Sequence, residues 1–400
     1  MYTRVVTRRA VLRTGAALVM GRQALARAQE ELPRAFVGTF TDALGAEVPA
    51  YFRERPGGAR SRGLYTFTFD PATGRAGGIS LAAEVSNPFN LTVHPHRRVL
   101  YACRWPTQID GQNLITAFAV EGARLRELNT VRSGGGGPTV GVVDGTGRNL
   151  LTTNFVTSSI VCFRLRPDGS LAERSALIGP APGEAAAGGP AGDEAPRGPH
   201  DVVLSATERY AIATEIAANR CRVLRFDAER GTLETHQLAA DTPGAGPRHL
   251  VWHPGGRYLY TAGETGSSIS AWRWDERAGE LEAFQSVTTL PAGFTGRNQP
   301  ADIAMHPGGD FVYVTNRGAG TLAGFRIDPA DGRLSAIAPA DIGSPSSWSM
   351  VFDPSGAWAL AAAQIGDEVV VYAVDRDTGR LRPTGQTLAV TSPSCVRWAG

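Results

Sequence analysis

Hydrophobic and polar positions alternate along most of this chain, in a phrase that returns seven times. Each copy is an alternating segment centred on an aromatic residue, then an acidic or glycine-rich turn, and usually a leucine that begins a second alternating segment. Alternation with a period of two is typical of β-strands, and Gly, Asp and Pro between two such segments indicate a tight turn. The central aromatic residues are Phe67, Phe118, Phe163, Phe226, Trp272, Phe325 and Tyr372.

A second repeated unit precedes the aromatic phrase. It is clearest at 250–264 and 303–318, where a short apolar strand, a His-Pro-Gly-Gly turn and an alternating strand follow one another, as in a β-hairpin. Together the two units make four antiparallel strands, named a to d in chain order. The central aromatic residues are 45 to 63 positions apart, which is the period of propeller blades. The pattern therefore predicts an all-β fold, a seven-bladed β-propeller with four antiparallel strands per blade.

The two ends of the chain hold the missing hairpin of the seventh blade. Only six complete a–b units accompany the seven aromatic phrases. Residues 36–41 resemble strand b of the other repeats, and residues 393–398 resemble strand a. We therefore expect the ring to close by pairing of the N- and C-terminal strands in one blade, which removes exposed strand edges.

Composition adds information mainly about the first residues. Forty basic and 38 acidic residues give no strong net charge, which argues against nucleic acid as a partner.

The unbroken repeat favours one domain over residues 29–400. Residues 1–28 contain the pair Arg8 and Arg9, a short apolar stretch and small residues at the end, which predicts a twin-arginine export signal and a periplasmic or secreted protein. The apolar stretch is too short to span a membrane, and a basic, unstructured tail is the alternative.

Cysteine and histidine spacings match no metal-binding motif, so we expect neither a metal nor another cofactor. The cysteines lie in or beside predicted strands, where buried free thiols are expected: Cys103, Cys162, Cys221 and Cys395. Three histidines precede the turn between strands a and b at equivalent positions and are expected to stabilise it: His94, His253 and His306.

Departures from the repeat gather on one face of the predicted propeller. The start of strand a and the end of strand b lie at the same end of a blade, and the long insertions fall in the loops there: 42–62, 104–113, 179–199 and 291–300. Polar residues at these strand ends should surround the channel mouth: Asn87, Asn154, His200, Arg248, His249, Glu264, Asp302, Asn316, Arg317 and Gln364. Each alone could cap a strand end. A histidine, two arginines and a glutamate in one funnel would be costly to desolvate without a function.

These residues resemble the seven-bladed lactonase family, which includes bacterial 6-phosphogluconolactonases and fungal carboxy-cis,cis-muconate lactonizing enzymes. The resemblance covers residues 36–398 and rests on Pro247-Arg248-His249 before an apolar strand, Glu264 at the end of strand b, and Asn316-Arg317-Gly318 one blade later. It implies a catalytic group made of His200, Arg248, Glu264 and Arg317. We assign substrate binding to neighbouring positions of the same face: Asn87, Asn154, His249 and Asn316.

The resulting hypothesis is a monomeric hydrolase that opens a sugar lactone or related cyclic ester by metal-independent acid–base catalysis. Arg248 and Arg317 would hold an anionic substrate group and stabilise the carbonyl oxyanion, while Glu264 or His200 activates water. Two alternatives stay open. The same residues could lactonize an unsaturated dicarboxylate, or the propeller could bind a sugar or protein without catalysis.

Overall fold

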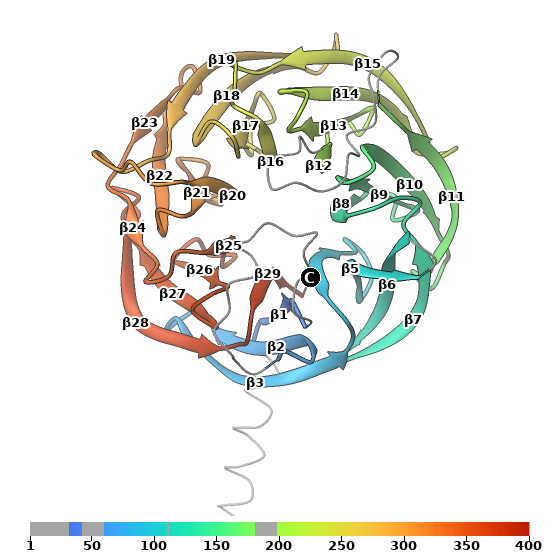
Figure 1. Cartoon of the computed structure of the whole chain (residues 1–400), viewed down its shortest axis with the longest axis horizontal. Helices are drawn as coiled ribbons and strands as arrows, with labels where there is room; N and C mark the ends of the chain where they lie inside the picture. Colours follow the sequence, from blue (N-terminus) through green and yellow to red (C-terminus); the bar gives the residue numbers. More distant parts are fainter. Residues whose placement is uncertain (1–31, 42–59, 110–111, 181–197, 400) are drawn as a thin grey trace, which may run out of the picture.

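Seven antiparallel sheets surround a central axis, and each sheet corresponds to one predicted repeat (Figure 1). The computed structural model describes residues 32–41, 60–109, 112–180 and 198–399. Within these residues no helix is long and apolar enough to cross a membrane. The predicted all-β, seven-bladed propeller is confirmed.

The first four blades contain these strands, from the axis outward. Blade 1 contains β29 (Pro393–Trp398), β1 (Arg34–Thr39), β2 (Gly63–Asp70) and β3 (Arg75–Glu84). Blade 2 contains β4 (Pro88–Val93), β5 (Val99–Ile109), β6 (Gln112–Glu121) and β7 (Arg124–Arg132). Blade 3 contains β8 (Pro138–Val143), β9 (Asn149–Asn154), β10 (Ser159–Leu165) and β11 (Leu171–Ile178). Blade 4 contains β12 (Pro199–Leu204), β13 (Tyr210–Glu215), β14 (Arg220–Asp227) and β15 (Thr232–Ala240).

The last three blades follow the same order. Blade 5 contains β16 (Pro247–Trp252), β17 (Tyr258–Gly263), β18 (Ser268–Asp275) and β19 (Glu280–Thr288). Blade 6 contains β20 (Gln299–Met305), β21 (Phe311–Arg317), β22 (Thr321–Ile327) and a divided outer strand, β23 (Leu334–Ala336) and β24 (Ala340–Asp341). Blade 7 contains β25 (Ser347–Phe352), β26 (Trp358–Ala363), β27 (Glu368–Val374) and β28 (Leu381–Ala389).

Blade 1 closes the ring as expected. Strand β29 pairs antiparallel with β1, with Val396 opposite Val37 and Trp398 opposite Ala35. The Ala399 N–H extends the ladder by donating to the Arg34 carbonyl at 2.8 Å. The last strand of the chain therefore occupies the innermost position of the first blade.

Within the described residues, the divided outer strand of blade 6 is the one departure from four strands per blade. Strands β23 and β24 both pair with β22, and the residues between them include Pro339. Proline has no N–H to donate, so it interrupts a strand ladder most easily at an outer edge.

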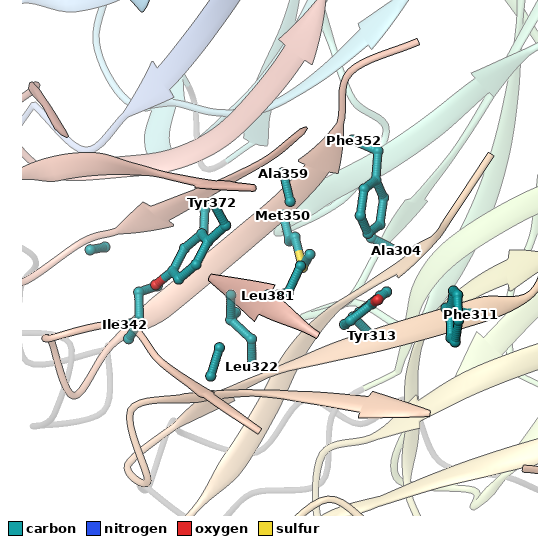
Figure 2. Packing of buried hydrophobic residues seen from close by; sticks show 13 residues of the cluster. Ala304, Phe311, Tyr313, Leu322, Ile342, Met350, Phe352, Ala359, Tyr372 and Leu381 are labelled. Atoms are coloured by element: carbon teal, nitrogen blue, oxygen red, sulfur yellow. The ribbon is translucent and has the colours of Figure 1, made fainter. Parts of the chain in front are cut away.

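Apolar side chains fill the space between adjacent blades. Figure 2 shows the cluster between blades 6 and 7, where Tyr313 and Phe311 from β21 pack near Met350, Phe352 and Tyr372. Tyrosine hydroxyls also join neighbouring blades, since each of three donates to a glycine carbonyl in a turn of the next blade at 2.5 to 2.9 Å. The pairs are Tyr101–Gly169, Tyr260–Gly332 and Tyr313–Gly379.

The expected histidine and cysteine roles are also visible. The imidazoles of His94 and His306 each contact a glycine carbonyl of the next blade's a–b turn, at 3.2 and 3.0 Å, and each accepts a backbone N–H within its own turn. His253 accepts the Gly255 N–H in the same way. All four cysteines are free and buried, and burial raises the pKa of the Cys103 thiol to about 12.

Candidate active site

A β-bulge interrupts the innermost strand of every blade near its start, after the first residue in six blades and after the second, Pro300, in blade 6. The bulge adds one residue that has no partner on strand b, and such an insertion re-aims neighbouring side chains. In blade 5 it brings Arg248 and His249, which are adjacent in sequence, into side-chain contact at 3.0 Å. The inserted residues, in blade order, are Ser394, Phe89, Thr139, His200, Arg248, Ala301 and Trp348.

A second set of equivalent positions lies at the end of strand b. In each blade one residue of strand b pairs with the residue just before the bulge, and the next residue of the chain lies at the same end of the propeller. In blade order these residues are Phe40, Trp105, Phe155, Ile216, Glu264, Arg317 and Gln364. The two sets together supply all the side chains that line one small pocket: Phe89, Trp105, Phe155, His200, Arg248, Glu264, Arg317 and Trp348.

This pocket brings together the four residues predicted to be catalytic. His200, Arg248, Glu264 and Arg317 come from blades 4, 5 and 6 and share it with four aromatic residues. The space open to the centre of a water-sized sphere is about 10 Å³, roughly enough for one water molecule. The insertions predicted for the same face at 42–62, 104–113 and 179–199 lie partly outside the described residues.

Glu264 joins the two arginines across a blade boundary. Its Oε2 atom lies 2.8 Å from Nε of Arg248 in the same blade and 3.3 Å from Nη2 of Arg317 in the next blade. Arg317 also donates to the backbone carbonyls of Gln299 and Pro300 at 3.0 and 3.3 Å. Both arginine side chains are 3% exposed and Glu264 is 12% exposed. The contact is therefore more than a bridge between two strands of one blade, because it fixes two guanidinium groups from different blades.

His249 and Asp302 lie directly behind Arg248. Nδ1 of His249 is 2.8 Å from Oδ1 of Asp302, and Nε2 is 3.0 Å from Nη1 of Arg248. Burial, together with the adjacent Arg248 charge, lowers the pKa of His249 to about 4. Burial alone would raise the pKa of Asp302, but the hydrogen bond with His249 and the nearby charges outweigh it and hold this pKa at about 2. His249 is thus neutral and Asp302 ionised at neutral pH.

His200 occupies the boundary between the charged and aromatic sides of the pocket. Its ring centroid is 5.5 Å from that of Phe155 and 5.0 Å from that of His249. Its backbone carbonyl accepts a hydrogen bond of 2.5 Å from the Thr139 hydroxyl, which fixes the bulge that carries it. His200 is 4% exposed and is one of the residues that line the pocket.

Sequence reasoning missed the aromatic side of the pocket. Five aromatic residues form one buried cluster there: Phe40, Phe89, Trp105, Phe155 and Trp348. Successive rings lie 5.2 to 5.9 Å apart, which are ordinary aromatic contacts. The guanidinium carbons of Arg317 and Arg248 lie 4.8 and 5.7 Å from the Trp348 ring centroid. An alignment of the seven predicted a strands would have found Phe89 and Trp348, because they occupy the same position in their strands as His200 and Arg248.

None of the four residues assigned to substrate binding lines the pocket. The Asn87 side chain accepts the Thr41 N–H at 2.9 Å, and Asn154 donates to Ser159 at 3.1 Å. Asn316 exchanges hydrogen bonds with Thr289, Asn298 and Thr321 at 2.8 to 3.0 Å. Their contacts are those of residues that order loops, and His249 lies behind Arg248. The substrate-binding role of these four residues stays a prediction.

A second buried charge cluster lies close to the site. Asp201 and Asp302 occupy equivalent positions in β12 and β20, and Arg397 of β29 interacts with both carboxylates. Burial is the main cause that raises the pKa of Asp201 to about 7. Within the described residues, no group of three His, Cys, Asp or Glu side chains is placed to hold a metal ion.

Comparison with known proteins identifies the family. Residues 34–398 match the family described as "Lactonase, 7-bladed beta-propeller". The chain belongs to this lactonase family. Among its relatives, the 6-phosphogluconolactonase of Bacillus subtilis (strain 168) is 28% identical over 344 residues, which cover 84% of this chain and 95% of that protein.

Similar solved structures agree with the assignment to this family. The periplasmic gluconolactonase of Pseudomonas aeruginosa is 27% identical with a TM-score of 0.80, covering 92% of this chain and 99% of that one. A protein from Lactobacillus plantarum is 25% identical with a TM-score of 0.78 and the same coverage. The family match spans all seven blades and therefore includes every residue of the pocket.

Proposed function

We propose that this lactonase-family protein hydrolyses a sugar lactone at the pocket of Glu264, Arg248, Arg317 and His200. The observation that carries the proposal is the Glu264 carboxylate, which holds two guanidinium groups in one buried pocket beside an imidazole. Buried charges of this kind are expensive to desolvate and are typical of functional sites. The names of the relatives, 6-phosphogluconolactonase and gluconolactonase, support a sugar lactone as the substrate class.

The arrangement suits addition of water to a cyclic ester. A water oxygen attacks the carbonyl carbon, and His200 takes a proton from that water, since imidazole accepts and returns protons near neutral pH. Negative charge then develops on the carbonyl oxygen, where Arg248 and Arg317 stabilise it. The ring C–O bond breaks as His200 returns the proton to the departing ring oxygen, and the product is an open hydroxy acid.

Glu264 acts mainly on the two arginines in this proposal. Its carboxylate is engaged by both guanidinium groups, which leaves His200 better placed to handle the proton. The negative charge of Glu264 lies between the two guanidinium groups, offsets their mutual repulsion and holds both of them at the pocket. The aromatic side of the pocket offers Trp105, Phe155 and Trp348 as apolar surface for the non-reacting face of the substrate ring.

A hydrolysis panel tests the proposal. Purified protein is mixed with sugar lactones, phosphorylated sugar lactones and a carboxymuconate. Proton release and absorbance changes measure the opening or closure of the ring. We expect accelerated opening of at least one sugar lactone, with losses of about 100-fold in kcat for Arg248→Ala and His200→Asn. Arg126→Ala, at an exposed ion pair beside the turn between β6 and β7, is the matched control and should change nothing.

Three results would overturn the proposal. Turnover of the muconate alone would point to a lactonizing enzyme that uses the two arginines for carboxylates. If the wild-type protein binds sugars but accelerates none of these reactions, it is a binding protein. Full activity of both site variants would move the chemistry to another part of the chain.

We also propose that the protein is exported and acts as a monomer. The Arg8-Arg9 pair and the similarity to a periplasmic gluconolactonase support export, although residues 1–31 lie outside the described part of the chain. Fusion of residues 1–28 to a reporter that is active only after export would test this, with Arg8→Lys and Arg9→Lys as the control. Retention of the reporter in the cytoplasm would contradict it.

A further inference from the structure

Three buried side chains and the largely buried Glu264 form a continuous series of contacts that ends in the proposed active site. Oδ1 of Asp302 lies 2.8 Å from Nδ1 of His249, and Nε2 of His249 lies 3.0 Å from Nη1 of Arg248. Nε of Arg248 lies 2.8 Å from Oε2 of Glu264. We propose that His249 and Asp302 are positioning residues that hold the Arg248 guanidinium in its reactive place, an inference that rests on the proposed function.

The donors and acceptors in this series allow one arrangement of protons. A guanidinium group can only donate, so Nε2 of His249 must accept the hydrogen bond from Arg248. The imidazole then carries its proton on Nδ1 and donates it to Asp302. The lowered pKa of His249, about 4, agrees with a neutral ring that can accept. Asp302 therefore fixes the tautomer of His249. The acceptor on His249 and the Ala301 carbonyl, which accepts from the same Nη1 atom at 2.5 Å, together fix the direction in which Arg248 points.

Asp302 can do this because its own carboxylate is held on both sides. Oδ1 accepts the Ile303 N–H at 3.0 Å, and Oδ2 accepts the Met350 N–H of the next blade at 3.0 Å. Its backbone N–H donates to the Thr315 hydroxyl at 2.9 Å. Asp302 and His249 are 5% and 4% exposed, so water does not compete for these contacts. Because this network holds Asp302 and His249 in place, they need little reorganisation when charge develops on the substrate.

Asp201 provides a matched comparison inside the same molecule. It occupies the equivalent position in blade 4 and makes the same backbone contacts, with the Val202 N–H at 2.8 Å and the Leu250 N–H of the next blade at 3.3 Å. The structure pairs His249 with Asp302 and not with Asp201. Asp201 therefore joins two blades as Asp302 does, without directing a histidine.

Two substitutions of His249 separate positioning from packing. His249→Gln places an amide oxygen near the position of Nε2 and keeps an acceptor for Arg248, whereas His249→Asn keeps a donor to Asp302 and loses that acceptor. We expect His249→Asn to lower kcat about 10- to 100-fold with KM changed less than threefold, since small misplacements of a catalytic group have effects of this size. His249→Gln should retain kcat within about threefold. Asp302→Asn should lower kcat as His249→Asn does, and Asp201→Asn should leave it unchanged.

Crystal structures of the same variants make the test independent of activity. The Arg248 Nε to Glu264 Oε2 separation should exceed the 4 Å limit of an ion pair in His249→Asn and stay near 2.8 Å in His249→Gln. Equal kcat values for the Gln and Asn variants, equal effects of Asp302→Asn and Asp201→Asn, or an unmoved Arg248 in His249→Asn would each overturn the inference. If the wild-type protein opens no lactone, the proposed function fails and the crystal structures alone decide whether Arg248 is positioned in this way.

Discussion

Arg317 lies over the indole ring of Trp348, with its guanidinium carbon 4.8 Å from the ring centroid. The indole N–H donates to Ser346 Oγ at 3.1 Å and to Gln364 Oε1 at 3.0 Å, so the ring has a fixed orientation. A cation above an aromatic face is attracted to it, more strongly where water is excluded. The aromatic side of the pocket therefore orients the charged side.

We expect Trp348→Leu to lower kcat/KM on a cognate lactone by about tenfold, because Arg317 loses the surface that orients it. Trp348→Phe keeps an aromatic face and loses the indole N–H, so it should fall between the wild type and the Leu variant. Steady-state kinetics with melting temperatures for all three proteins provide the measurement. An unchanged kcat/KM in the Leu variant would show that Arg317 needs no aromatic support.

Glu264→Gln should destabilise the fold as well as reduce turnover. Removing its charge takes away the carboxylate that two buried guanidinium groups from neighbouring blades share, and breaking a buried ion pair costs about 3–5 kcal/mol. Glu84→Gln is the matched control, since its pair with Arg62 is well exposed and should contribute less than about 1 kcal/mol. Urea unfolding of both variants compares the two free energies. Equal losses of unfolding free energy in the two variants would show that the buried ion pair stabilises the fold no more than an exposed one.

The pH dependence of stability should expose Asp201. Burial raises the pKa of its carboxyl to about 7 in the folded state, well above the ordinary value of an aspartate, about 4. Between about pH 4 and pH 7 the folded state therefore binds more protons than the unfolded state, and stability falls as pH rises. The lowered pKa of His249 acts in the opposite direction, because stability falls as pH drops from about 6.5 to about 4. Asp201→Asn removes the first effect only.

We therefore expect the unfolding free energy of Asp201→Asn to rise more steeply with pH than that of the wild type between pH 4 and 6.5. Chemical denaturation at three pH values in this window provides the measurement. Parallel curves for the two proteins would contradict the assigned direction of the Asp201 pKa shift.

Truncation after Thr391 should destabilise the whole ring. It removes β29, whose pairing with β1 closes blade 1, and with it Val396, which belongs to a core shared with blade 7. An unpaired β1 also presents an open strand edge, which promotes aggregation. Thermal melting and size-exclusion chromatography of the truncated protein against the full chain check this. A cooperative, monomeric protein with an unchanged melting temperature would contradict it.

The sequence predicted the architecture well because the relevant signals are local. Alternation around residues such as Phe67 and Trp272, with glycine-rich turns, specifies each hairpin within about fifteen positions. Closure by residues 36–41 and 393–398 followed from counting the repeats. The divided outer strand of blade 6 was missed because Pro339 acts on a strand that has little patterning of its own.

The site was predictable only in part. His200, Arg248, Glu264 and Arg317 stood out because buried charge is unusual, and they do share one pocket. Phe89 and Trp348 did not stand out, since an aromatic residue in a strand normally belongs to a core. The contact of His249 with Asp302 depends on the bulge in β16, which shifts the register between Pro247 and His249 and leaves no trace in the alternation pattern.

The repeated bulge has a consequence for how such a protein can change. Each blade contributes one inserted inner residue and one residue from the end of strand b to the pocket end, and these positions hold side chains as different as Ser394, Phe89, His200 and Arg248 on the same backbone. The backbone hydrogen bonds around them do not depend on the side chain presented. A new specificity can therefore arise from single exchanges at this rim, blade by blade, while the seven sheets beneath retain their register.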